Sequence, residues 1–255
     1  MAYSTSATKA ELAFPGPVAA GASKMKAKRV QEWLCFHGFQ TAIDSDFGNA
    51  TRVSFENFQR AKGLPASGVV DLATWDGLTA PLSQLMAVGV PPGTTVDAAI
   101  LHIARQHLLT HPIELGGPNA GPWVRAYTGG NDGKDWLWCA AFVTFVMKQA
   151  CSLIGAATPI PGSVSCDSLA AQAKAAKRFV PGGTSPPPWP TLGACQIFLV
   201  RRTSTDWTHT GFCFDGVNDT FTTIEGNSDH NGSSNGFEVC QQSRSITKKD
   251  FIRLT

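Results

Sequence analysis

A cysteine, a histidine, a glutamate and an asparagine are placed in this sequence where together they could form a nucleophilic site. Cys139 stands in residues 135–147, DWLWCAAFVTFVM, directly after a loop rich in glycine and aspartate and at the start of an apolar run. We therefore expect a buried helix with Cys139 in its first turn, where unpaired backbone N–H groups and the helix dipole favour an anion. This position favours a thiolate, which is the nucleophilic form of cysteine.

The alternative for Cys139 is a purely structural role. Cysteine is among the most frequently buried residue types, and this chain contains seven of them. The other cysteines of the second half lie on apolar faces or in loops without a matched partner, and we expect them to be structural: Cys151, Cys166, Cys195, Cys213 and Cys240.

Partners for Cys139 are found on predicted strands near the C-terminus. His209 lies in the motif WTHTG, and Glu225 and Asn227 lie in TIEGN, which an antiparallel pairing can bring beside His209. His209 would then act as the base, Glu225 would hold its far ring nitrogen, and Asn227 would polarise the site or bind substrate. His230 is a rival base, but it lies in a glycine-rich loop that would hold it less firmly.

These motifs carry a resemblance to a known family. WCAAFV at 138–143, WTHTGF at 207–212 and TIEGN at 223–227 resemble the CHAP amidohydrolases/peptidases, papain-like enzymes related to the NlpC/P60 group, and ELGGPNAGPWV at 114–124 resembles their lead-in. The family's Cys, His, Glu and Asn correspond in order to Cys139, His209, Glu225 and Asn227. The resemblance implies hydrolysis of a peptidoglycan amide bond through a thioester, by either an N-acetylmuramoyl-L-alanine amidase or an endopeptidase.

The segment before Cys139 supplies candidate substrate-binding residues. Residues 112–135 are expected to be irregular, and segments of this length without secondary structure are often functional. Side chains in and just after this segment could line a cleft, with packing of the loop itself as the alternative: Glu114, Asn119, Trp123, Tyr127 and Trp136. We expect Asn119, Tyr127, Trp136 and also Trp138 to bind substrate.

No metal or other cofactor is expected. His107 and His111 are four residues apart on a predicted helix, but no glutamate follows His107, so the metalloprotease motif is absent. Partly buried helix histidines are the better interpretation. A zinc-dependent wall amidase is disfavoured because His209 and His230 are the only histidines of the second domain outside its first helix.

A smaller helical unit precedes this domain. The motifs VQEWLCFHGF from Val30, IDSDFG from Ile43, TRVSFENFQ from Thr51 and GVV from Gly68 resemble the three-helix peptidoglycan-binding domain. The resemblance implies affinity for the bacterial cell-wall polymer, and the alternative is a bundle that kept the fold and lost the ligand. Ser45 replaces a glycine of the pattern, and it would be strained if its turn needs a positive φ.

The order of predicted elements indicates two domains. We expect a flexible tail at 1–22, the peptidoglycan-binding domain at 23–80, a linker at 81–94 that is rich in proline, and the hydrolase domain at 95–255. The second domain has helices first and strands afterwards, which predicts an α+β fold with helices packed on an antiparallel sheet. The resemblance makes this fold papain-like.

The composition of the chain limits its expected binding partners and the cellular compartment in which it folds. The chain is 43% hydrophobic and 16% charged with a net charge of +2, so we expect a soluble globular monomer that binds neither nucleic acid nor membrane. The N-terminus lacks the features of a secretory signal, and an odd number of cysteines suits a reducing cytoplasm. We expect the protein to reach the wall after release or delivery by another system, as phage lysins do. The competing class is a non-catalytic wall-binding protein.

Overall fold

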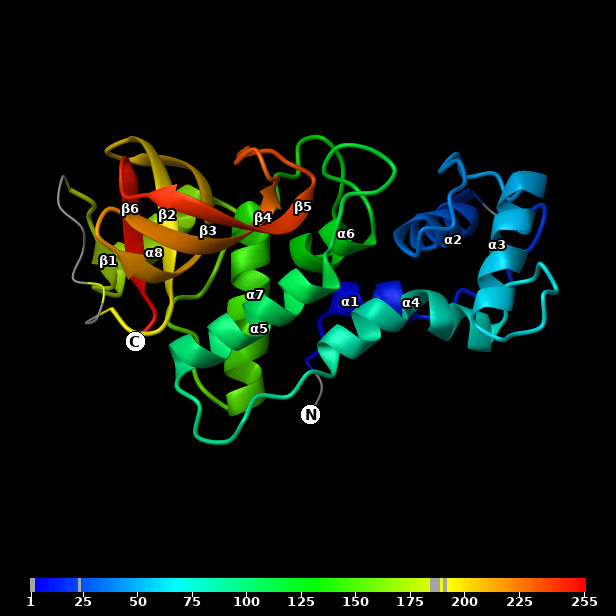
Figure 1. Cartoon of the computed structure of the whole chain (residues 1–255), viewed down its shortest axis with the longest axis horizontal. Coiled ribbons are helices and arrows are strands. Elements are labelled where there is room, and N and C mark those ends of the chain that lie inside the picture. Colours follow the sequence, from blue (N-terminus) through cyan, green and yellow to red (C-terminus); the bar gives the residue numbers. More distant parts are fainter. Residues whose placement is uncertain (1–2, 23, 184–188, 190–191) are drawn as a thin grey trace. The chain divides into compact units, whose positions relative to one another are not determined.

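The chain forms two compact units that alternate along the sequence. The computed structural model describes residues 3–22, 24–183, 189 and 192–255 (Figure 1). One unit, here called the sheet unit, comprises the described residues of Met1–Ser4, Ala87–Pro112 and Asp135–Thr255. The other, called the helical unit, comprises the described residues of Thr5–Met86 and Ile113–Lys134.

The helical unit is built around aromatic side chains. Trp33, Phe55, Phe58 and Trp75 have no exposed surface and come from three different helices. Burial of one large aromatic side chain removes about 150–250 Å² of surface from water, so these residues dominate the stability of the unit. The helices are α1 (Ser6–Leu12), α2 (Lys24–Phe36), α3 (Asn49–Ala61), α4 (Leu72–Met86) and α6 (Pro122–Thr128).

Two parts of this unit differ from the sequence-based expectation. The expected tail contains α1, which begins with a capping box at Thr5 and ends near a hydrogen bond from Trp75 Nε1 to Leu12 O (2.9 Å). The expected linker begins inside α4, because the helix continues through Pro81 to Met86. Its later turns continue to bury leucine side chains, Leu82 and Leu85, which favours the longer helix.

Ser45 has the backbone conformation that the glycine of the resembled pattern suggested. Its φ is 67°, in the left-handed region that favours glycine. We predict that Ser45→Gly raises the free energy of unfolding by about 1 kcal/mol, because the strain of an L residue is removed. The backbone N–H that donates to Gln31 Oε1 (3.0 Å) is retained in the variant.

Denaturant unfolding and, in a separate experiment, calorimetric melting measure this change in the free energy of unfolding. The control is Ser83→Gly, an exposed serine within α4, where glycine is expected to cost about 0.5 kcal/mol. If Ser45→Gly and Ser83→Gly changed the free energy of unfolding equally and in the same direction, the positive φ of Ser45 would not be a source of strain.

Arg125 of α6 ties the second segment of the helical unit, Ile113–Lys134, to the first segment, Thr5–Met86. Its guanidinium bonds Glu11 Oε1 at 2.7 Å, Glu32 Oε2 at 2.6 Å and Asp132 Oδ2 at 2.8 Å. Only 12% of the Arg125 side chain is exposed. Burial would lower its pKa, but the bonds to Glu32 and Glu11 outweigh burial and raise it. Residues expected to lead into the catalytic domain are thereby tied to the helical unit.

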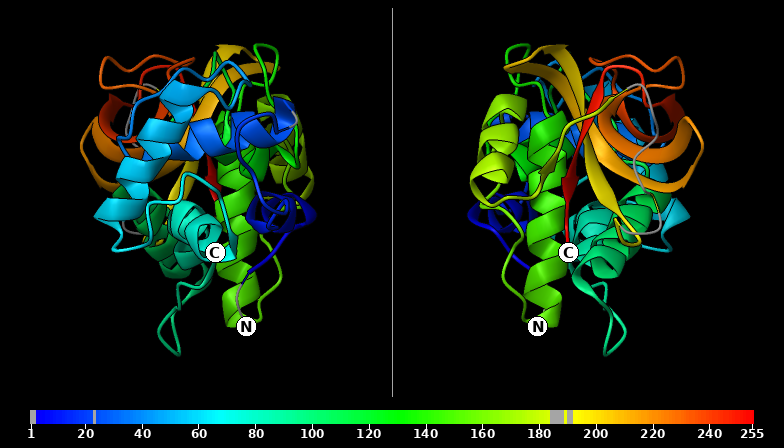
Figure 2. Two further views of the ribbon diagram at one scale, coloured as in Figure 1. Left: turned by 90° about the vertical axis from the view of Figure 1, so that its right-hand side faces the viewer. Right: turned by 90° about the vertical axis from the view of Figure 1, so that its left-hand side faces the viewer.

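The sheet unit combines helices with a six-stranded antiparallel sheet, as the α+β expectation required. The strand order is β1-β6-β2-β3-β4-β5, and α7 runs along the sheet against β3 and β4 while α5 packs on α7 (Figure 2). The helices are α5 (Val96–Thr110), α7 (Cys139–Ile154) and α8 (Cys166–Ala175). The strands are β1 (Phe179–Val180), β2 (Gln196–Thr203), β3 (Asp206–Val217), β4 (Thr220–Ser228), β5 (Glu238–Ser245) and β6 (Lys249–Arg253).

The hairpin between β3 and β4 turns later than at the Asp215-Gly216 pair, where the residue types predict the turn. Asp215 and Gly216 remain in β3, where the register shifts between Phe214 and Val217, and the chain turns at Asn218 and the residue after it. Asp215 (φ 49°) and Asn218 (φ 50°) both adopt the left-handed conformation, which is least costly for such short polar residues. A bulge therefore replaces the predicted turn.

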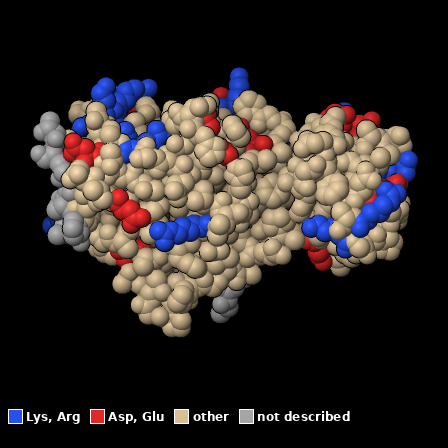
Figure 3. Space-filling view, in the orientation of Figure 1, with Lys and Arg blue, Asp and Glu red and all other residues tan. Residues whose placement is uncertain are grey.

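Charged side chains are scattered on the face shown in Figure 3, where basic and acidic residues alternate rather than gather into one field. In the part of the chain that the structure describes, no helix is both long and apolar enough to cross a membrane.

Candidate active site

Cys139 is the first residue of α7, as the sequence predicted. Trp138 is the N-cap, and its carbonyl accepts the hydrogen bond of Phe142 N at 2.8 Å. Cys139 is buried, with 3% of its surface exposed. Its pKa lies well below the usual value because of a bond from the Cys166 thiol, the interaction with His209 and the Ala140 backbone N–H, which together outweigh burial. The site therefore favours a thiolate.

His209 lies on β3 between Cys139 and Glu225. Its Nε2 is 2.7 Å from Glu225 Oε2, and both side chains are almost fully buried. The other ring nitrogen, Nδ1, makes no hydrogen bond of ordinary geometry with the described residues. Burial would lower the pKa of His209, but its interactions with Cys139 and Glu225 raise it to about 9. Thiolate and imidazolium therefore stabilise each other below about pH 9.

Two glycines permit the close approach of the elements that carry these groups. A Cβ on Gly211, two residues after His209 on β3, would lie 2.8 Å from Glu225 Cγ. A Cβ on Gly226 of β4 would lie 2.7 Å from Phe142 and Trp138 at the start of α7. Real side chains do not tolerate such contacts, so both positions require glycine if the carboxylate and the thiol are to stay in place.

Arg244 of β5 is a site residue that the sequence analysis missed. Its guanidinium binds Glu225 in a bidentate manner, with Nε to Oε1 at 2.8 Å and Nη2 to Oε2 at 2.6 Å. Thr223 Oγ1 also donates to Glu225 Oε1 at 2.6 Å. Burial raises the pKa of Glu225, but His209 and Arg244 lower it to about 2. The glutamate is thus held ionised and fixed in orientation.

We predict that Arg244→Met lowers the rate at which Cys139 is alkylated and changes the pH dependence of this reaction. The pKa of Glu225 would rise without the bidentate guanidinium, so the carboxylate that supports imidazolium would be lost at higher pH than in the wild type. In the wild type this carboxylate contributes its stabilisation fully above pH 4.5 and loses it as the pH falls through about 2. The rate should fall roughly ten- to a hundredfold, as for loss of a partner that orients a catalytic group.

Alkylation of Cys139 by iodoacetamide as a function of pH measures this effect without any substrate. The acidic limb of the profile should move to higher pH in Arg244→Met and return toward the wild type in Arg244→Lys, which keeps the charge. A uniform loss of rate without movement of the limb would assign Arg244 a structural role only.

Asn227 is buried with neither side-chain polar atom bonded among the described residues. It also adopts a left-handed backbone conformation, with φ at 56°. An unsatisfied buried donor or acceptor costs about 1–3 kcal/mol, so the Asn227 amide keeps unused hydrogen-bonding capacity beside Glu225 of the same strand. No bond to His209 or Glu225 is present, so its polarising role stays a prediction.

The four predicted substrate-binding residues are divided between the two units. Trp138 is fully buried and packs beside Gly226 of the sheet unit, while Trp136 is partly exposed in the loop that precedes α7. Asn119 and Tyr127 belong to the helical unit and are buried there. Asn119 Nδ2 donates to Lys134 O at 3.1 Å, and Tyr127 stacks on Trp123 with ring centres 6.4 Å apart. The substrate-binding role of the four residues stays a prediction.

Cys166 differs from the structural role expected for it. It is the first residue of α8, and its Sγ lies 3.9 Å from Cys139 Sγ. Asp167, the next residue, accepts a hydrogen bond from Trp207 N at 2.7 Å, which fixes the start of α8 against β3. The pKa of Cys166 is raised by the neighbouring Cys139 and by burial, so a thiol stands beside the thiolate.

The other histidines are placed outside this site. His107 is buried and bonds Gln149 Oε1 at 2.9 Å, with a pKa lowered to about 4 by burial. His111 Nε2 lies 2.5 Å from Glu238 Oε2, and the His230 side chain is 79% exposed. Across the described ranges, no three or more His, Cys, Asp or Glu side chains are grouped to hold a metal ion.

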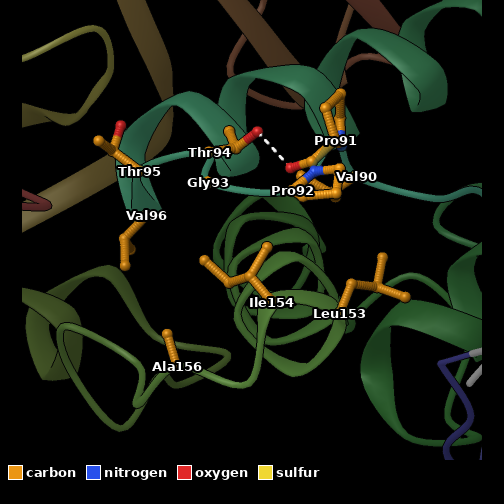
Figure 4. A pocket seen from close by; sticks show the side chains of 10 residues that line it. All are labelled: Val90, Pro91, Pro92, Gly93, Thr94, Thr95, Val96, Leu153, Ile154 and Ala156. Atoms are coloured by element: carbon orange, nitrogen blue, oxygen red, sulfur yellow. Dashed lines mark hydrogen bonds between the residues drawn. The ribbon is translucent and has the colours of Figure 1, made fainter.

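A separate pocket of about 590 Å³ lies at the far end of α7 (Figure 4). Val96, Leu153 and Ile154 are among its lining residues, and Thr94 Oγ1 donates to Pro91 O at 2.7 Å within the loop that borders it. Helix α7 has 16 residues and a rise of about 1.5 Å each, so the pocket is roughly 20 Å from Cys139. It is not part of the candidate active site.

Comparison with known families identifies the N-terminal part of the chain. Residues 26–78 match the family model of a peptidoglycan binding domain, which confirms the resemblance of the helical motifs. Searches of curated proteins and of solved structures gave no match. The matched domain supports peptidoglycan as a partner and suggests an association with the cell wall.

Proposed function

We propose that the sheet unit is a cysteine-dependent hydrolase of peptidoglycan amide bonds. The observation that carries this proposal is the arrangement of Cys139 at a helix start with His209 bonded to Glu225 at 2.7 Å. A nucleophile, a base and a group that orients the base are the components of covalent acyl transfer. The peptidoglycan-binding domain supplies the substrate class, because it raises the local concentration of the polymer.

The mechanism follows from the charges of the site. The Cys139 thiolate attacks the amide carbonyl, and the first backbone N–H groups of α7 are placed to bind the developing oxyanion. The His209 imidazolium protonates the leaving amine, which leaves a thioester on Cys139. Neutral His209 then removes a proton from water, and the hydroxide releases the acyl group. Glu225, held by Arg244, keeps the imidazole ring oriented through both steps.

The family-level form of this proposal is a papain-like CHAP amidase or endopeptidase that works as a monomer without a cofactor. It is supported by the order Cys139, His209, Glu225, Asn227 and by the helix and antiparallel sheet that carry them. Delivery to the wall by another system, as for a phage lysin, belongs to the same proposal.

A second candidate is a non-catalytic protein that only binds the wall. It is favoured by the burial of Cys139, His209 and Glu225, which are 3%, 1% and 0% exposed. A hydrolase with this site must open to admit a polymer, whereas a binding protein need not.

Digestion of purified peptidoglycan, with products identified by mass spectrometry, decides between the two candidates. The hydrolase releases soluble fragments, and their masses separate cleavage between sugar and L-alanine from cleavage within or between peptide stems. Sedimentation of the protein with the wall is measured in parallel. Binding without release of fragments, at every pH between 5 and 9, would overturn the hydrolase proposal in favour of the binding protein.

A further inference from the structure

We propose that Cys139 and Cys166 form a reversible disulfide, so that the nucleophile of the sheet unit is an oxidative modification site. The proposal concerns the contact of the two thiols and goes beyond the proposed hydrolysis. It can hold whether or not the sheet unit cleaves peptidoglycan.

The contact between the two sulfur atoms is already close. Their separation of 3.9 Å is about the distance of van der Waals contact, and a disulfide bond requires about 2.05 Å. Cys139 and Cys166 each begin a helix, α7 and α8, where the preceding loop can adjust more easily than a helix interior. A combined movement of about 2 Å therefore closes the bond.

The chemical difference between the two thiols sets the order of events. Cys139 is the thiolate, stabilised by His209, and thiolates react with peroxides, whereas Cys166 retains its proton. Hydrogen peroxide oxidises the Cys139 thiol to a sulfenic acid and is reduced to one water. The Cys166 sulfur then attacks the Cys139 sulfur, the S–S bond forms as the S–O bond breaks, and the hydroxide takes the Cys166 thiol proton and leaves as a second water. A dithiol reductant reverses the reaction and is itself oxidised to a disulfide.

The other buried cysteines of the sheet unit do not share this setting. Burial raises the pKa values of Cys195 and Cys213, which keeps both as unreactive thiols. Cys151 lies on the same helix as Cys139, twelve residues further on, which separates them by about 18 Å. It is also protonated, with a pKa raised to about 11 by burial. It therefore serves as the matched control.

The test is treatment of the full chain with a small excess of hydrogen peroxide, followed by alkylation and tryptic digestion without reduction. Cleavage after lysine places Cys139 alone in residues 135–148 and places Cys151 with Cys166 in residues 149–174. We expect these two peptides to be linked in the wild type and in Cys151→Ser. The link should disappear after treatment with dithiothreitol, and the number of free thiols should fall by two upon oxidation.

The variant Cys166→Ser separates this proposal from simple oxidation of a reactive cysteine. Without its partner, Cys139 should proceed to sulfinic acid, which dithiothreitol does not reverse. A link that persists in Cys166→Ser, or a wild type in which Cys139 reaches sulfinic acid while Cys166 is still alkylated, would overturn the proposal.

These measurements use masses and thiol counts, so they remain valid for a protein that shows no hydrolysis. If the wild type does release wall fragments, peroxide should abolish the release and dithiothreitol should restore it in the wild type but not in Cys166→Ser. Failure of hydrolysis with a normal disulfide would reject the proposed function alone.

Discussion

Cys139→Ala is expected to lower hydrolysis of peptidoglycan by roughly 10⁴- to 10⁶-fold, the range found when a covalent nucleophile is removed. Alanine cannot attack the amide carbonyl, and His209 has no thiol left to deprotonate. Turbidity loss of wall suspensions and release of soluble fragments both measure the effect. Sedimentation with the wall should be unchanged, because the matched peptidoglycan-binding residues 26–78 lie in the helical unit.

The control for this variant is Cys151→Ala, a second buried cysteine on α7. It removes the same atoms from the same helix at a place about 18 Å from the site. We expect near-normal hydrolysis and a loss of about 1 kcal/mol in stability. Equal loss of activity in both variants, or residual activity in Cys139→Ala within tenfold of the wild type, would remove Cys139 as the nucleophile.

Arg125→Met is expected to have the largest effect on stability, about 3–5 kcal/mol, because two buried carboxylates lose their closest cation. Only the longer ion pairs to Arg29 and Lys28, both at 3.6 Å, then remain. Glu11 and Glu32 are 5% and 0% exposed, and both bond Arg125 directly. Methionine fills a similar space but offers neither charge nor hydrogen-bond donors. Denaturant unfolding of the full chain, followed by tryptophan fluorescence and circular dichroism, measures the change.

An exposed arginine provides the comparison. Arg60 has 58% of its side chain exposed and bonds Glu56 at 3.4 Å, so Arg60→Met should change stability by less than about 0.5 kcal/mol. Adding Glu11→Gln and Glu32→Gln to Arg125→Met should recover part of the loss, because the unpaired charges are then removed as well. If Arg125→Met were no more harmful than Arg60→Met, the buried cluster would not be what holds residues 113–134 in the helical unit.

The parts of the site that the sequence predicted are those with local signals. A glycine-rich loop followed by an apolar run places Cys139 in the first turn of a helix, and the structure has it there. Alternation along two strands separated by a short turn is enough to suggest that His209 and Glu225 face one another, and they do. The glycine pattern of the helical unit likewise indicated the strained turn at Ser45.

The parts that were missed depend on contacts between residues far apart in the sequence. Arg244 meets Glu225 because of the pairing between β4 and β5. The apolar pattern predicts a strand only from Phe237 to Cys240, which ends before the arginine. Cys166 meets Cys139 across 27 residues, and Arg125 meets Glu11 across 114. Composition also gave no sign of α1, whose place depends on tertiary contacts such as that from Trp75. Periodicity and capping describe single elements, and they do not contain the register or packing that joins them.

The alternation of the two units has a practical consequence for cutting and recombining this chain. The backbone passes between them after Ser4, Met86, Pro112 and Lys134. The helical unit is therefore made of two separate segments of the chain and is not one continuous domain. A protease that nicks the chain after Met86 would leave residues 113–134 on the C-terminal fragment. Arg125 would then hold the two fragments together by its bonds to Glu11 and Glu32 until a denaturant separated them. A chimera built by transplanting residues 23–80 alone would likewise leave Glu32 buried without Arg125, so a functional exchange of targeting modules must carry the 113–134 segment as well.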